Sequence, residues 1–323
     1  WGLLRWSKRN FEKELGNIGP KTYDKVCELI LRLQANMLAP AMHEASTAFY
    51  QIPENKEIAD RYGVMITTSH CAPLQLNTAS EWSKEYGEWN YTSNKAKVDS
   101  VLKARVQDAS PYENVYTLAL RGLHDRAMSG DEDMDSRKRT MQEALLAQRQ
   151  ILADVLGKKA EDIPQVFTPY KEVLDVFNRG LMLPDDVTIV WPDDNYGYFK
   201  RLSSPKEQLR SGRSGVYYHS SYLGRPHDYL WMNTTSPTVM YEELRKAYDT
   251  TADRFWLLNA GDIKSCEFAV DFFLAMAYDI DAFDYKRAAS YRAEWLAEML
   301  GQEHYEAFLS IFDGFYHQAF IRK

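Results

Sequence analysis

The sequence has few cysteines and no long hydrophobic run. Its three cysteines, Cys27, Cys71 and Cys266, form no CxxC motif, so we expect single buried thiols and no disulfide framework. No activated-cysteine signature surrounds Cys71, which disfavours a nucleophilic role for it. No apolar stretch approaches the roughly 20 residues that a membrane-spanning helix needs, so no membrane partner is expected.

A basic stripe is also missing. Lys and Arg number 39 against 46 Asp and Glu, and the basic residues of this chain with net charge -7 are scattered. Nucleic acid is therefore not an expected partner. With 45% hydrophobic residues the composition is that of a globular protein, and its 21 Tyr and 8 Trp suit an aromatic core as well as stacking on sugar rings.

Seven short runs of β-branched or aromatic residues each stop at a polar or charged cluster. Segments with the apolar spacing of a helix separate them, such as 21–33, where Val26, Leu29, Ile30 and Leu33 share one face. This alternation favours a parallel sheet with right-handed crossovers. The runs are 36–44, 65–73, 116–125, 166–172, 188–195, 216–222 and 255–262, and the further helices are 55–62, 94–108, 136–156, 237–250 and 265–278.

The order of elements predicts an α/β protein with a TIM-like (β/α)8 barrel over residues 1–282. Only seven strands are visible, so we expect the first strand to be missing or truncated. After Ala282 the helices 285–300 and 303–321 carry more apolar surface than two helices can bury alone. Residues 283–323 are therefore predicted to begin an α-helical bundle. Barrels of this class keep their active sites at the carboxyl ends of the strands.

Charged residues lie at the carboxyl ends of the third and fourth runs. A guanidinium matches a carboxylate, so Arg121 is a candidate for binding an acidic substrate, whereas an Arg121–Asp125 ion pair that braces the loop explains it equally well. Glu172 follows Pro169 and Tyr170, where a partly buried carboxyl suits a general acid. The alternative for Glu172 is a first-turn residue stabilised by the helix dipole.

Polar residues after the other runs leave similar alternatives open. Asp193 and Asp194 are candidates for positioning a substrate or orienting a histidine, or they are turn residues. His43, His70 and His219 are candidate site residues, or hydrogen-bonded core histidines. The sequence has no HxH, no HExxH and no cysteine cluster, so we predict no metal site.

Six long segments in the same order resemble glycoside hydrolase family 115, the xylan α-1,2-glucuronidases, over about residues 1 to 300. They are MHEASTAFY at 42–50, GVMITTSHCAPL at 63–74, YTLALRGLHDRAM at 116–128, YKEVLDVF at 170–177, WPDDNYGY at 191–198 and GVYYHSSYLGRPHDYLW at 215–231. The resemblance implies a catalytic barrel followed by a helical bundle, within a larger multidomain enzyme that is secreted or periplasmic and usually a homodimer. Its substrates are glucuronoxylan and glucuronoxylo-oligosaccharides, from which it releases glucuronic acid or 4-O-methylglucuronic acid by inversion without a cofactor.

Inversion requires two carboxyl groups about 6.5–9.5 Å apart. The residues that match by resemblance are Asp125, which we predict to be the base, and Glu172, which we predict to be the acid. The substrate-binding residues that the resemblance implies are Arg121, His43, His70, Trp89, Asp194, Asn195, His219 and Tyr222.

The family carries an acidic motif before the tryptophan that corresponds to Trp1, and this motif is absent here. Because the chain starts at Trp1 without an initiator methionine, we expect a fragment boundary there and an isolated chain that lacks part of its site. Two other functions stay open. One is a metal-dependent barrel hydrolase with His43, His70, Asp125 and His219 as ligands, and the other is a carbohydrate-binding barrel without catalysis.

Overall fold

The chain forms two compact units. The computed structural model describes residues 2–130, 133–222 and 232–321. The first unit comprises Trp1–Arg32, Asn36–Ile189 and Arg210–Gly212, and the second comprises Leu33–Ala35, Val190–Leu209 and Arg213–Lys323.

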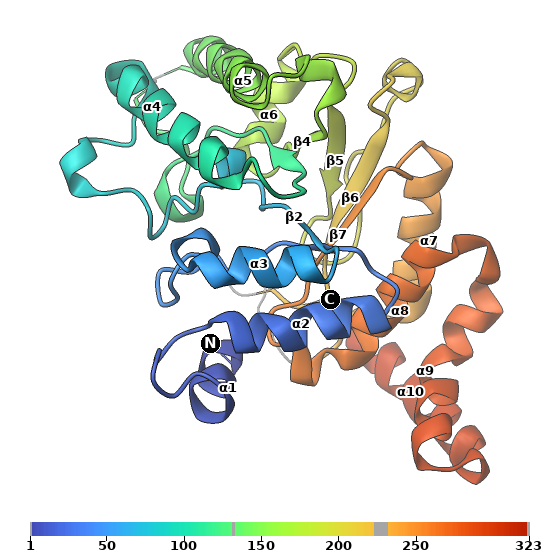
Figure 1. The fold of residues 1–323 in the computed structure, drawn as a ribbon. Helices are drawn as coiled ribbons and strands as arrows, with labels where there is room; N and C mark the ends of the chain where they lie inside the picture. The colour runs from blue at the N-terminus through green and yellow to red at the C-terminus, as the bar shows by residue number, and fades with distance from the viewer. Residues whose placement is uncertain (1, 131–132, 223–231, 322–323) are drawn as a thin grey trace. The chain divides into compact units, whose positions relative to one another are not determined.

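The first unit alternates short parallel strands with helices (Figure 1). Strand β1 (Met37–Leu38) pairs in parallel with β2 (Met65–Ile66). Strand β3 (Tyr116–Thr117) pairs with β4 (Gln165–Phe167), and β4 pairs with the start of β5 (Thr188–Pro192). The helices of this unit are α1 (Gly2–Asn10), α2 (Pro20–Arg32), α3 (Pro53–Arg61), α4 (Tyr91–Ala109), α5 (Met134–Leu156) and α6 (Glu172–Asn178).

Local sequence explains the ends and the buried face of α5. The Asp133 side chain accepts hydrogen bonds from the backbone N–H groups of Asp135 and Ser136, as an N-cap should. Gly157 ends the helix in the left-handed conformation with φ 63°, which glycine adopts without a steric penalty. Residues at helical spacing along one face, among them Met141, Leu145 and Leu152, are buried.

The second unit contains a longer strand pair. Strands β6 (Ser214–His219) and β7 (Phe255–Asn259) are parallel and in register from Gly215↔Phe255 to His219↔Asn259. The last three residues of β5 belong to this unit, and the strand order of the five-stranded sheet is β3-β4-β5-β6-β7. The helices of this unit are α7 (Pro237–Asp249), α8 (Glu267–Tyr278), α9 (Tyr285–Leu300) and α10 (Tyr305–Ile321).

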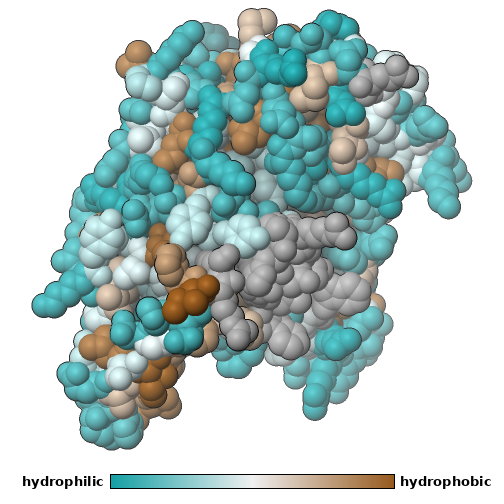
Figure 2. Space-filling view, turned by 180° about the vertical axis from the view of Figure 1, so that it is seen from behind, coloured by the Kyte–Doolittle hydropathy of each residue, from teal (hydrophilic) through white to brown (hydrophobic). Residues whose placement is uncertain are grey.

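The C-terminal helices leave apolar surface uncovered. No residue of α10 is buried, and among the described residues Met299, Leu300, Ile311 and Phe320 are exposed. Figure 2, seen from behind, shows hydrophobic side chains at the lower left, the side on which α9 and α10 lie. This exposure agrees with the expectation that two helices alone do not bury their apolar surface, and the predicted helical bundle stays a prediction.

The secondary-structure predictions are largely confirmed. Each of the seven predicted runs contains or overlaps a strand, and each of the eight predicted helices overlaps an observed one, whereas α1 and α6 were not predicted. The described residues hold seven strands in a two-stranded and a five-stranded sheet. They show a mixed α/β fold with parallel strands, and a complete eight-stranded barrel is not shown by them. Within the same residues, no helix is long and apolar enough to cross a membrane.

Candidate active site

The carboxyl ends of β3 and β4 bring two carboxylates onto one arginine. Arg121 follows β3, and its Nε and Nη2 donate to Glu172 Oε1 and Oε2 at 3.0 and 2.8 Å, a two-pronged ion pair. Its Nη1 contacts Asp125 Oδ1, four residues further along the chain. The Arg121 side chain is only 2% exposed, whereas those of Asp125 and Glu172 are 34% and 24% exposed. The guanidinium of Arg121 is therefore buried, while the two carboxylates that it binds are accessible to solvent.

Two further donors surround Asp125. His70, in the loop after β2, places Nε2 2.6 Å from Asp125 Oδ1. Lys171, at the end of the β4 loop, donates from Nζ to Asp125 Oδ2 at 3.0 Å. The His70 ring also packs edge-on against Tyr170 with centroids 4.4 Å apart. We refer to Arg121, Asp125, Glu172, His70 and Lys171 as the carboxylate cluster.

The backbone of the carboxylate cluster is strained. His124, Asp125 and Lys171 have φ of 56°, 69° and 53°, values that side-chain-bearing residues rarely adopt. Each such residue costs about 1–3 kcal/mol, and such residues gather at active sites and ligand clamps. Two neighbouring strand ends thus carry both the charged side chains and the strain.

A tight turn fixes the position of Asp125. The backbone N–H of Gly122 donates to Arg126 O at 2.9 Å and closes the loop that contains Asp125. A Cβ on Gly122 would lie 2.5 Å from Ala127 O, closer than a side chain tolerates. Only glycine at this position allows the backbone at the start of the loop to approach the backbone at its end so closely.

Trp89 stabilises the backbone at Arg121 by a hydrogen bond. Its indole Nε1–H donates to Arg121 O at 2.6 Å, and the side chain is buried. Trp82 packs edge-on against it, with ring centroids 4.9 Å apart. The structure therefore places the predicted substrate residue Trp89 next to the carboxylate cluster, in a supporting position. His43 lies exposed after β1, where its Nδ1 accepts a hydrogen bond from Ala45 N–H at 3.1 Å.

The metal hypothesis is only partly compatible with the observed groups. Among the described residues, the group with metal-ligand geometry is His70, Cys71 and Asp125, whose ligand atoms lie within 4.8 Å of one another. His43 and His219 are not members of it. Arg121 and Lys171 already supply positive charge at Asp125, and burial raises the pKa of the Cys71 thiol, so these residues fit a cation poorly.

The second unit holds a different polar pair at the ends of β5 and β6. Asp193 Oδ1 and His219 Nδ1 are 2.5 Å apart, and both side chains are buried. Burial raises the pKa of the Asp193 carboxyl, and His219 lowers it in part. The rings of Tyr217 and Tyr222 lie 4.6 and 5.4 Å from the His219 ring. Asp193 therefore orients the histidine.

The neighbouring predicted residues serve the turn that follows β5. Asp194 Oδ1 accepts hydrogen bonds from the backbone N–H groups of Tyr196 and Tyr198 at 2.9 and 3.2 Å, which is ordinary turn chemistry. Asn195 is buried with φ 67°, and Tyr222 is half-buried. The rest of the last family segment, residues 223–231, lies outside the described residues.

Sequence reasoning missed Lys171 as a site residue. The residues alone left Asp193 and Asp194 open, and the resemblance selected Asp194, whereas the structure pairs Asp193 with His219. The signal for Lys171 was its position next to Glu172 in the same strand-end segment. No sequence pattern discloses that its ammonium turns toward Asp125, because those residues are 46 positions apart.

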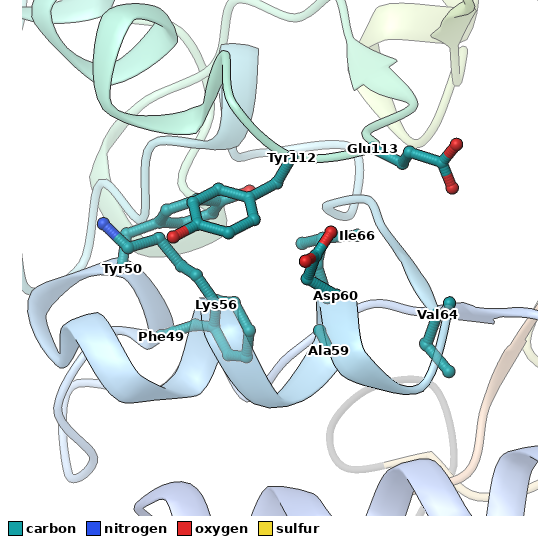
Figure 3. A pocket seen from close by; sticks show the side chains of 10 residues that line it. Phe49, Tyr50, Lys56, Ala59, Asp60, Val64, Ile66, Tyr112 and Glu113 are labelled. Carbon is teal, nitrogen blue, oxygen red and sulfur yellow. The ribbon is translucent and has the colours of Figure 1, made fainter.

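A separate cavity lies at the opposite ends of the strands. It has a volume of about 10 Å3, and its lining includes Lys56, Asp60, Val64 and Glu113 (Figure 3). Val64 and Glu113 precede β2 and β3, so this is the amino-terminal end of the strands, which in barrels serves stability. The cavity holds about one water molecule, too little for a sugar.

Parallel strands whose carboxyl ends carry paired carboxylates define an α/β protein with a candidate site for acid–base chemistry. The family model of glycosyl hydrolase family 115 matches residues 1–323, and the chain belongs to this family.

One solved structure agrees with this assignment. A family GH115 4-O-methyl-α-glucuronidase with specificity for decorated arabinogalactans is 39% identical, with a TM-score of 0.94 over 99% of this chain and 42% of that chain. A glycoside hydrolase family 5 enzyme from Prevotella bryantii is 12% identical, with a TM-score of 0.43 over 79% of this chain and 86% of that chain. A D-psicose 3-epimerase is 11% identical, with a TM-score of 0.39 over 79% and 92%. The last two likenesses are too low to carry an argument. No curated protein sequence matches the chain.

Proposed function

We propose that this chain is the part of a glycoside hydrolase that releases α-linked glucuronic acid or 4-O-methylglucuronic acid side chains from a polysaccharide. The observation that carries the proposal is the pair Asp125 and Glu172, held on one buried guanidinium at two neighbouring strand ends. Family membership and the related α-glucuronidase support the reaction class. The chain spans less than half the length of that relative, so the activity of the whole protein is part of the proposal.

The proposed mechanism is inverting. A carboxylic acid gives its proton to the glycosidic oxygen as the bond from the anomeric carbon to that oxygen breaks. A carboxylate takes a proton from the water whose oxygen forms the new bond on the opposite face of the sugar. This chemistry needs two carboxyl groups about 6.5–9.5 Å apart, and Asp125 and Glu172 contact different nitrogens of the Arg121 guanidinium.

Glu172 is proposed as the acid and Asp125 as the base. Each oxygen of Glu172 accepts a hydrogen bond from Arg121. The acid role requires that one of these oxygens leaves Arg121 and takes up a proton when the substrate binds, while the other keeps its hydrogen bond. Arg121 then acts as the group that positions both carboxylates, which is the loop-bracing alternative that the sequence left open.

The substrate is proposed to be glucuronoxylan, with the uronic acid on O2 of xylose. Decorated arabinogalactan, the substrate class of the related enzyme, is the competing polymer. His43, His70, Trp89, Asp194, Asn195, His219 and Tyr222 remain the proposed substrate-binding residues, with Asp193 added as the group that orients His219.

The architecture of the complete enzyme belongs to the same proposal. The seven strands are proposed to be seven strands of a (β/α)8 barrel within residues 1–282, and residues 283–323 the beginning of a helical bundle. The complete enzyme is proposed to be a secreted or periplasmic homodimer.

The test is uronic acid release from glucuronoxylan and from decorated arabinogalactan, with the product anomer followed by NMR. This chain is compared with a form extended at its amino-terminal end. Release of the β-anomer by the extended form supports an inverting hydrolase. No release by either folded form, together with retained binding of the polysaccharide, would replace the hydrolase with a binding module.

A further inference from the structure

Lys171 stands out among the charged residues of the carboxylate cluster. Its side chain is 40% exposed, while the Arg121 side chain beside it is 2% exposed. Its backbone has φ 53° and ψ -126°, outside the regions that lysine normally adopts. A lysine kept in a strained conformation at a strand end needs a reason beyond local folding.

Arg121 is not available for a substrate carboxylate. All three of its guanidinium nitrogens already face carboxylate oxygens, two at Glu172 and one at Asp125. Binding a third carboxylate there would break an ion pair that is buried on the arginine side, which is costly. The prediction that Arg121 holds the acidic substrate stays untested, and its observed contacts favour the alternative of an ion pair with Asp125.

A uronate entering the cluster would meet two carboxylates of its own sign. Asp125 and Glu172 both reach solvent, so the approaching anion needs a cation that can turn toward it. An ammonium is a point charge with rotatable donors on a flexible stem, and Lys171 holds Asp125 through a single contact of 3.0 Å.

We propose that Lys171 binds the carboxylate of the uronosyl residue and, in turning to it, releases Asp125 Oδ2. This inference rests on the proposed function and makes it more specific. Asp125 Oδ1 keeps its contacts with His70 and Arg121, so the carboxylate stays oriented. The freed Oδ2 then accepts the proton of the attacking water. Lys171 is a substrate-binding and positioning residue, and the base is engaged only when an acidic sugar is bound.

The experiment measures the binding of D-glucuronate and of neutral D-glucose to the chain by calorimetry. The variants are Lys171→Met, which removes the charge, and Lys171→Arg, which keeps it. Lys159→Met is the matched control, because Lys159 is another exposed lysine paired with a carboxylate, Glu161. We expect Lys171→Met to weaken glucuronate binding at least tenfold and to leave glucose binding unchanged. Lys171→Arg should retain most of the affinity, and the control should behave as the unaltered chain.

A Lys171→Gly variant separates function from stability. Glycine tolerates φ 53°, so this variant should melt at the same or a higher temperature and still lose glucuronate binding. If Lys171 had only a structural role, its replacement by glycine would not keep or raise the melting temperature while abolishing glucuronate binding.

Three outcomes decide the matter. Unchanged glucuronate affinity in Lys171→Met, or no preference of the unaltered chain for glucuronate over glucose, overturns the inference. Uronic acid release with an unchanged KM in Lys171→Met overturns it while the proposed function stands. Lys171-dependent glucuronate binding with no uronic acid release by the extended form supports the binding role of Lys171 and removes the proposed hydrolase.

Discussion

The two polar clusters of this chain differ in burial and in charge. In the first unit, five charged or titratable side chains meet at strained strand ends, and both carboxylates reach solvent. In the second unit, the pair of Asp193 and His219 is buried. The first arrangement suits a group that must exchange partners and protons with a substrate. The second suits a histidine that must keep one orientation.

The largest expected effect is on kcat, which should fall more when a carboxylate of the first cluster is replaced than when Asp193 of the second cluster is replaced. In the form of the enzyme that releases uronic acid, Asp125→Asn or Glu172→Gln should lower kcat by about 10²- to 10⁴-fold, because each removes a proton-transfer group. Steady-state kinetics on glucuronoxylan measures this, and circular dichroism confirms folding. Asp193→Asn should cost less, because Asp193 acts through His219. Near-normal kcat in both first-unit variants would remove their catalytic assignment.

A second test concerns the stability of the first cluster. Arg121→Met leaves two carboxylates without their shared cation, and the free energy of unfolding should fall by about 3 kcal/mol, the low end for buried pairs because the carboxylates reach water. Urea denaturation measures the loss. The exposed Arg32, paired with Glu28 on α2, is the control, and Arg32→Met should change little. Equal effects of the two substitutions would mean that the cluster adds nothing to stability.

The raised pKa of Asp193 in the second cluster should make the stability of the chain depend on pH. Burial raises the pKa of Asp193, so the folded chain binds this proton more tightly than the unfolded chain. The contribution of Asp193 to stability should then decrease as pH rises above the ordinary value of 3.8 through the raised pKa.

Asp193→Asn should remove this dependence and cost about 1–2 kcal/mol through the weakened hydrogen bond to His219. Thermal unfolding of both proteins between pH 4 and 7 gives the comparison, with His219 and Asp194 as the titratable neighbours in each. Parallel stability curves would contradict the assignment of the shift to Asp193.

The smallest effect measures the strain at the first cluster. Lys171→Gly should raise the free energy of unfolding by about 1 kcal/mol, the relief of a positive φ less the extra flexibility of the unfolded chain. Lys159, with an ordinary φ of -64°, is the control, and Lys159→Gly should lower stability slightly. Destabilisation by both changes would argue that Lys171 is not strained.

The pattern of apolar residues along the sequence predicted the fold more completely than it predicted the site. Short apolar runs located the seven strands of the described residues, because a buried parallel strand needs a continuous apolar stretch. The extent of the short α6 was not predicted, because Glu172 was interpreted either as a general acid at a strand end or as a first-turn helix residue. It is the first residue of that helix, as the second interpretation has it. Proximity of Arg121, Asp125 and Glu172 was predictable from strand ends that meet at one edge.

The partners within the site were not predictable. Whether Arg121 faces a substrate or two carboxylates depends on side-chain directions after β3 and β4, which no spacing rule determines. The division of labour between Asp193 and Asp194 depends on which one points into the core, and adjacent residues in a turn have no fixed alternation.

The closed turn at Gly122 has a consequence for sequence variation. A library that places every amino acid at each position of residues 121–126 should return active or folded members with changes at exposed Arg126, and essentially none at position 122, where even alanine meets the Ala127 carbonyl. The smallest residue of the loop is thus the one with the least freedom to mutate.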